Sequence, residues 1–180
     1  MKHLSVIALG ILCILAASCE KKESSFDKQE SNIQAIVASL MKANEDATTD
    51  YNEGSVRVTL VHGDGQALEK GGAVSFYYAG FYITGTSLNN GSLFATNYDT
   101  FASFARWTVT DSTAFDIKTV SLAKDDIVEG LRNGLIGVKG GDECYVLFSG
   151  KHGFGKHNIA NIPPDAALAY HLWIKSVTND

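Results

Sequence analysis

The stretch Asp125–Trp173, DDIVEGLRNGLIGVKGGDECYVLFSGKHGFGKHNIANIPPDAALAYHLW, decides the fold of this chain. It begins with two aspartates that can cap a helix, followed by apolar residues at helical spacing. Gly134 and Gly137 allow close packing and an early stop. A short helix beginning at Asp125 or Asp126 is therefore predicted. Its apolar positions are Ile127, Val128, Leu131 and Leu135.

Two strands are predicted after this helix. Residues 143–148 form a short, mostly apolar run, and a polar turn at 139–142 separates them from the helix. Residues 168–177 alternate in polarity, with every second side chain apolar. Strands that are crossed on one face by one short helix predict an α+β sheet.

Further strands are predicted upstream. Residues 56–60 alternate between apolar and polar side chains, which indicates a half-exposed strand. Residues 73–83, AVSFYYAGFYI, have the aromatic and β-branched content of a central strand. The connection 84–114 is polar but carries several aromatic residues, and a short helix is predicted around 100–105. A strand is predicted to follow at 115–120.

The N-terminus has the pattern of an export signal. Residues 1–18 combine a short polar start with an apolar run that is too short to span a bilayer stably. The sequence Leu15-Ala16-Ala17-Ser18-Cys19 is similar to the bacterial lipobox, so cleavage before Cys19 and acylation of this cysteine are expected. Ordinary signal cleavage at small residues is the alternative. A lipid-anchored protein outside the cytoplasm, at the periplasmic face of a bacterial membrane or at the outer membrane, is therefore predicted.

Residues 19–50 are predicted to form a tether, and residues 51–180 the folded domain. The charged, serine-rich segment 20–30 has little to bury. Apolar residues then recur at helical spacing, so a short amphipathic helix is expected to pack on the domain or on a second copy of the chain. They are Ile33, Ile36, Val37, Leu40 and Met41.

Composition argues against several classes of function. A net charge of −5 does not favour nucleic-acid binding. Cys13 leaves with the signal and Cys19 carries lipid, so Cys144 in its apolar strand reads as a core residue and no disulfide framework is expected. The histidines lack metal-ligand spacing, so neither a metal nor another cofactor is predicted.

Two motifs of other protein classes do not fit this sequence. Residues 150–157, GKHGFGKH, nearly match a phosphate-binding loop. However, His157 replaces the required Ser or Thr, and Pro163-Pro164 follows where a helix would be needed. The G-x-S-x-G motif of hydrolases does not occur.

Five short motifs between Val56 and Val177 occur in an order that is typical of one protein family. They are Tyr77-Tyr78-Ala79-Gly80, Gly91–Thr96 around Phe94, the pair Ile127-Val128, Gly153-Phe154-Gly155, and Ile162-Pro163-Pro164. In this order they resemble the FKBP-type peptidyl-prolyl isomerases. The resemblance implies an antiparallel, strongly twisted sheet of about five strands wrapped around one short helix, here preceded by an N-terminal helical segment.

The resemblance also implies an apolar pocket of nine side chains. The catalytic walls would be Tyr78, Phe94, Val128, Leu131, Phe154 and Tyr170. Substrate would also contact Phe115, Ile127 and Ile162, with Ile117 as the alternative to Phe115.

Four departures from the family pattern bear on activity. Leu131 stands where the pocket floor is usually Trp, Ala95 replaces the Asp of a Phe-Asp motif, and Phe154 replaces a Tyr. The missing hydroxyl at Phe154 removes a hydrogen bond of about 1 kcal/mol, or about fivefold in affinity. The connection from Ala95 to Phe115 is also longer than in compact members of the family.

The implied function is cis-trans isomerisation of X-Pro bonds, assisting the folding of exported proteins. Amide resonance opposes rotation with a barrier near ~20 kcal/mol, and a dry apolar pocket favours the twisted, less polar amide. The expected partners are proline-containing polypeptides, the membrane through lipid on Cys19, and macrolide ligands of the family. The alternative is a non-catalytic proline-peptide-binding or chaperone-like module with a degenerate pocket, whose surface includes the insertion 96–113.

Overall fold

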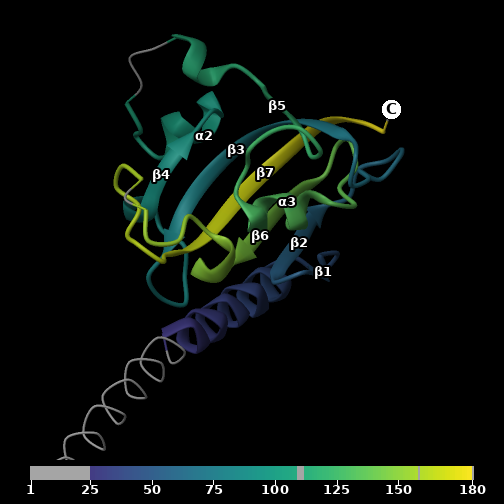
Figure 1. Ribbon diagram of the computed structural model, residues 1–180. Coiled ribbons are helices and arrows are strands. Elements are labelled where there is room, and N and C mark those ends of the chain that lie inside the picture. The colour runs from purple at the N-terminus through teal and green to yellow at the C-terminus, as the bar shows by residue number, and fades with distance from the viewer. Residues whose placement is uncertain (1–24, 109–111, 158, 180) are drawn as a thin grey trace, which may run out of the picture.

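Seven antiparallel strands form one sheet in the computed structural model, which describes residues 25–108, 112–157 and 159–179 (Figure 1). The strand order is β1-β2-β6-β7-β3-β4, and β5 pairs with β3. The strands are β1 (Thr48–Asn52), β2 (Ser55–Val61), β3 (Ala73–Ile83), β4 (Leu93–Thr96), β5 (Lys118–Ser121), β6 (Glu143–Phe148) and β7 (Ala167–Thr178). The helices are α1 (residues 25–43), α2 (Asp99–Phe104) and α3 (Glu129–Leu135), with 3-10 turns η1 (Asn90–Ser92), η2 (Ser112–Phe115) and η3 (Gly150–His152).

The two long strands β3 and β7 form the centre of the sheet. They pair from Ala73 opposite Thr178 to Ile83 opposite Ala167, with one irregularity between Ser75 and Phe76. The predicted α+β fold and its central strands are confirmed, but the sheet has seven strands rather than about five. The two strands that were not predicted, β1 and β4, are short, and β1 has the polar sequence TTDYN, so neither carries a strong alternating pattern.

Helix α3 packs tightly on the face around which the sheet curves (Figure 1). A Cβ atom on Gly130 would lie 2.2 Å from the Phe148 ring, and one on Gly134 would lie 2.2 Å from Val146. The predicted close packing at Gly134 is therefore confirmed. The predicted aspartate cap is wrong: the N-cap residue is Val128, without a side-chain cap, because the Asp125 carboxylate instead accepts a hydrogen bond from the Ser121 backbone at 2.8 Å.

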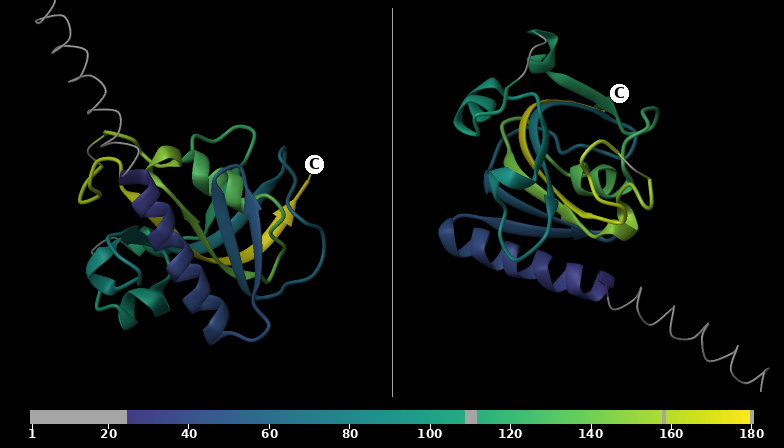
Figure 2. Two further views of the ribbon diagram at one scale, coloured as in Figure 1. Left: turned by 90° about the horizontal axis from the view of Figure 1, so that it is seen from below. Right: turned by 90° about the vertical axis from the view of Figure 1, so that its left-hand side faces the viewer.

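Helix α1 covers the opposite face of the sheet (Figure 2). Its buried side chains include Ile33 and Ile36, which share a core with Val56 and Val58 of β2. The predicted amphipathic helix, with its apolar residues packed on the domain, is therefore confirmed. It begins earlier than expected, since residues 25–30, predicted as part of a flexible tether, are already helical and Phe26 is only 8 % exposed.

Strand β2 is buried on both faces, which corrects the prediction of a half-exposed strand. From Ser55 to Thr59 its polar residues are buried like Val56 and Val58, and Arg57 is 8 % exposed; only the end of the strand, at Val61, is exposed. The reason is that α1 covers the valine side, while Ser55 and Arg57 bond to α3 on the other side.

The connection after β4 contains the predicted short helix, observed as α2. Phe101 and Trp107 pack on the same face of the sheet as α1, whereas Phe104 is 77 % exposed. Within the described residues, no helix has both the length and the apolar character needed to cross a membrane. The predicted signal, residues 1–18, and the lipidated Cys19 lie outside the described residues.

Candidate functional site

A cavity of about 380 Å³ lies between α3, the central strands and the loop before β7. Its volume is within the range of small-molecule sites in proteins. The cavity brings together eight of the nine predicted pocket residues. They are Tyr78, Phe94, Ile127, Val128, Leu131, Phe154, Ile162 and Tyr170.

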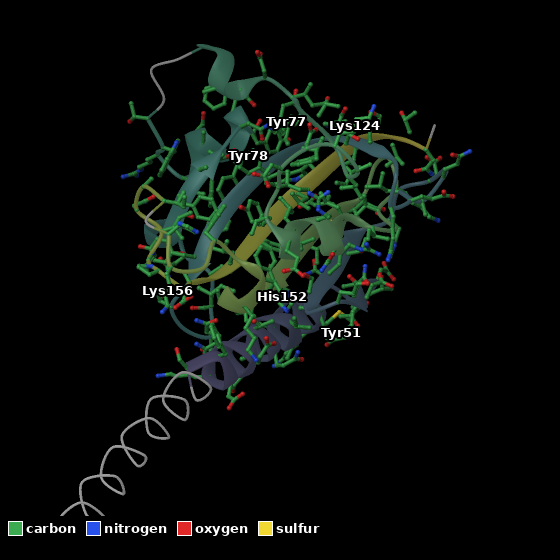
Figure 3. The ribbon with its side chains drawn as sticks, in the orientation of Figure 1. Tyr51, Tyr77, Tyr78, Lys124, His152 and Lys156 are labelled. Atoms are coloured by element: carbon green, nitrogen blue, oxygen red, sulfur yellow. The ribbon has the colours of Figure 1, made fainter. Side chains whose placement is uncertain are left out.

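Tyr170 lies at the centre of the aromatic wall. Its ring centroid is 5.7 Å from that of Phe94 in an edge-to-face arrangement, and 6.1 Å from those of Tyr78 and Phe148. Such ring pairs prefer these offsets and each contributes about 0.5–1.5 kcal/mol beyond the buried area. Figure 3 shows Tyr78 on β3, whose side chains alternate between this cavity and the outer face. The wall is therefore a connected aromatic cluster built across β3, β4, β6 and β7.

Helix α3 provides the floor through Leu131, which is 6 % exposed. The β1–β2 hairpin fixes the position of this helix. Ser55 Oγ donates to the Gly130 carbonyl at 2.7 Å, and Arg57 donates to the carbonyls of Gly134 and Ile136 at 3.1 and 2.5 Å. Because the final carbonyls of a helix lack intrahelical partners, the Arg57 guanidinium satisfies groups that would otherwise be buried and unpaired.

The segment that leads into α3 is held by Arg132. Its guanidinium donates to the carbonyls of Leu122 and Asp125. These bonds fix both ends of the turn that precedes Ile127 and Val128, two lining residues. The entry to the floor helix is thus positioned by a side chain of the helix itself.

The loop before β7 forms the remaining wall. The Asp165 backbone donates to the Gly155 carbonyl at 2.6 Å, and the Ile162 backbone donates to that of Ile159 at 2.9 Å. Gly150 permits this closure, since a Cβ there would lie 2.0 Å from the Asp165 carbonyl oxygen. Phe154 and Ile162 are thereby turned toward the cavity.

The placement of Phe115 in the pocket is wrong. Phe115 lies in η2, and the alternative Ile117 is 43 % exposed and outside the lining. Strand β5 begins only at Lys118, so Lys118 and Val120 line the cavity instead. Val120 and Leu122 are two residues apart and both apolar, and this spacing in the sequence indicates which face of β5 points into the core.

Phe76, Ile159, Ala160, Asn161 and Ala95 also line the cavity but were not predicted as site residues. The sequence predicts Phe76 only as part of a central strand. A strand pattern shows which residues share a face of the sheet, but not which of them lie beyond the floor helix and so reach the cavity. Residues 159–161 have no regular pattern. Only the closed loop places them at the cavity.

The two tyrosines of the cavity stay protonated. Burial raises the pKa of Tyr170, and it also raises that of Tyr78. Among the described residues, neither phenol oxygen has a hydrogen-bond partner. The wall therefore offers hydroxyl donors in an otherwise apolar cavity, an arrangement suited to a ligand with an apolar ring and a carbonyl group.

Other chemistry is not evident at this site. Within the residues that the structure describes, His, Cys, Asp and Glu side chains do not gather in groups of three or more that could hold a metal ion. Cys144 is buried in β6, and burial raises the pKa of its thiol to about 12. The thiol is therefore a core group rather than a nucleophile.

Comparison with known proteins supports the assignment of this fold. A family model described as FKBP-type peptidyl-prolyl cis-trans isomerase matches residues 65–175. No curated protein matches the chain in sequence.

Solved structures also resemble it. FkpA from Escherichia coli has a TM-score of 0.56 at 18% identity, covering 98% of this chain and 72% of that one. The three FKBP domains of wheat FKBP73 give 0.58 at 15% identity, covering 74% of this chain. The chain spans only 52% of the wheat protein. The N-terminal domain of FKBP42 from Arabidopsis thaliana gives 0.54 at 18% identity, with 74% and 94% coverage.

Proposed function

Because the chain belongs to the FKBP-type peptidyl-prolyl cis-trans isomerase family, we propose that its cavity catalyses cis-trans isomerisation of X-Pro bonds in polypeptides. The observation that carries this proposal is the convergence of Tyr78, Phe94, Phe154 and Tyr170 on one apolar cavity above α3. No nucleophile or metal is needed for the reaction, because no covalent bond is made or broken.

The proposed mechanism uses differential stabilisation of the twisted amide. Rotation about the X-Pro bond removes amide resonance and reduces its charge separation, so an apolar environment favours the twisted form over the planar one. The rings of Phe94 and Tyr170 hold the proline ring, and Leu131 supports it from below. The chain on the other side of the bond then rotates.

Polar groups at the wall orient the substrate. In this proposal the Tyr78 hydroxyl and the backbone NH of Val128, both from lining residues, donate hydrogen bonds to its carbonyl groups. Phe154 cannot donate, since it lacks a hydroxyl. Activity below that of a site with tyrosine at this position is expected, by about fivefold for one hydrogen bond of about 1 kcal/mol.

We further propose that the protein acts on exported polypeptides from a lipid anchor on Cys19. The sequence Leu15–Cys19 supports this proposal. Two or more acyl chains are needed for stable anchoring. Mass spectrometry of the N-terminal peptide from bacterial membranes tests it: a mature chain beginning at an acylated Cys19 is expected, and an unmodified cysteine contradicts it.

Isomerase activity is tested with the purified full chain and a tetrapeptide containing Ala-Pro, by exchange NMR. Acceleration of exchange above the uncatalysed rate is expected, and loss of it in Phe94→Ala at unchanged fold. Binding of the peptide without acceleration would contradict catalysis and identify a non-catalytic module. Ala95, Leu131 and Phe154 differ from the residues usual in the family and all line the cavity. They are the reason why binding without catalysis is the second candidate function. Macrolide binding at the same cavity is measured in parallel by calorimetry.

A further inference from the structure

Two charged side chains stand at the margin of an otherwise apolar cavity. Lys118 from β5 and Asp126 from the segment before α3 are the charged members of its lining. Both are exposed, whereas Phe76, Val120 and Tyr170 of the same lining are buried. The charges therefore lie at the mouth of the cavity and not on its floor.

The register of β5 explains the position of Lys118. Side chains two apart in a strand point to the same face, so Lys118 and Val120 share one face of β5. Val120 is buried in the core beside α3, and Lys118, opposite Phe76, lies one step further along the strand. The strand thus runs from the apolar interior to a cationic edge within two residues.

Neither charge is paired with an opposite charge in the part of the chain that the structure describes. Among the described residues, the Lys118 ammonium has no carboxylate within 4.0 Å, and the Asp126 carboxylate has no cation within that distance. The neighbouring Asp125 is engaged with the Ser121 backbone, at 2.8 Å. An ammonium with no internal partner can pair with a bound chain at no cost of breaking an existing contact.

A polypeptide that leaves the cavity on the β5 side passes this edge. When the proline ring enters the cavity, the residues before and after it leave through the mouth, where Lys118 stands. We propose that Lys118 makes the site selective for proline segments that carry an acidic side chain directly before or after the proline. This inference rests on the proposed isomerase function and names its substrate class.

Asp126, in the segment before α3, opposes the effect of Lys118 on substrate charge. It repels an acidic side chain and so limits the preference that Lys118 creates. Exposed ion pairs are weak, so a preference of about threefold is expected from Lys118 alone at low salt. It should fall as salt is raised, because charges about 10 Å apart are already largely screened at 0.1 M.

The test compares two peptide series with the full chain, Glu-Pro, Ala-Pro and Lys-Pro, and Pro-Glu, Pro-Ala and Pro-Lys. The measured quantities are kcat/KM by exchange NMR and Kd by fluorescence anisotropy of labelled peptides. A Glu-to-Lys ratio above one is expected in at least one series, held below the about threefold of Lys118 alone by Asp126. Lys118→Glu should reverse that ratio, and Asp126→Asn should increase it.

The matched control is Lys124→Glu, which changes the net charge equally. Lys124 is exposed in the turn after β5 and is not part of the cavity lining (Figure 3). Its substitution should leave the ratio unchanged. Equal shifts in the Lys124 and Lys118 variants would show general electrostatic attraction and overturn the inference.

The outcomes also separate the two proposals. Activity or binding with Ala-Pro but equal values for Glu and Lys in both series overturns the selectivity of Lys118 and leaves isomerase function intact. Charge-selective binding without turnover supports the selectivity and contradicts catalysis. If no peptide binds or is turned over, both proposals fail.

Discussion

Replacing Gly80 with alanine should damage the cavity without changing any residue that lines it. Gly80 lies in β3, directly beneath the ring of Phe94. An added Cβ would lie 2.5 Å from Phe94 Cζ and 2.7 Å from Cε2. Carbon atoms pack best at about 3.5–4.0 Å, so the ring must move by about 1 Å.

The expected effects follow from this displacement. Overpacking costs about 1–3 kcal/mol, and a chain of this size loses about 2–4 °C in Tm for each kcal/mol. The edge-to-face pair of Phe94 with Tyr170, now at 5.7 Å, should be disturbed. Since a misplacement of about 1 Å can cost up to about 100-fold in rate, kcat/KM for an Ala-Pro peptide should fall about 10- to 100-fold.

The assay combines exchange NMR with thermal denaturation followed by circular dichroism. Gly71→Ala is the control, because no atom lies within 4 Å of its added Cβ, and both quantities should stay near those of the original chain. Phe94→Leu in the Gly80→Ala background should recover stability, with a coupling of about 0.5–3 kcal/mol, but not activity. Full activity in Gly80→Ala would refute the assigned role of the Phe94 ring in catalysis. Stability losses of Gly80→Ala and Phe94→Leu that simply add in the double variant would refute the predicted clash between the two residues.

Three further outcomes are expected. Leu131→Trp should refill the floor and raise kcat/KM or macrolide affinity in calorimetry; an unchanged value in a folded variant would count against Leu131 as the floor. A chain beginning at Asn44 should be strongly destabilised in urea, because removing α1 exposes the core on the outer face of the sheet; an unchanged midpoint would show that α1 does not stabilise the domain. The hydrogen bond from His171, 2.8 Å from Glu143, lowers the pKa of Glu143, and burial lowers that of His171. Both shifts make the folded state bind fewer protons than the unfolded state. Tm should therefore be highest above pH 6.5, the ordinary pKa of histidine, and fall as the pH drops below 4.5 through the folded pKa of Glu143. The fall should be less steep in His171→Gln.

The candidate site was more predictable from the sequence than the edges of the fold. Six of the eight pocket residues lie in the short motifs that carry the family resemblance, such as Ile127-Val128 before α3 and Ile162 before two prolines, and this resemblance predicted the pocket. Phe115 failed because its strand begins three residues later, and a register error in a strand exchanges the faces of its side chains. Lys118 replaces it at the cavity, because Lys118 and the buried Val120 share one face of β5.

The sequence by itself determined the α+β class, the central strands, the floor helix and the amphipathic character of α1, because alternation and helical spacing are local properties; the pocket residues came from the resemblance to the family. Tertiary structure decided which elements share a face. It buried Arg57 against the end of α3, placed α1 on the outer face of the sheet, and set Lys118 at the mouth of the cavity. These positions depend on contacts between segments far apart in the chain, and no local pattern of residues records them.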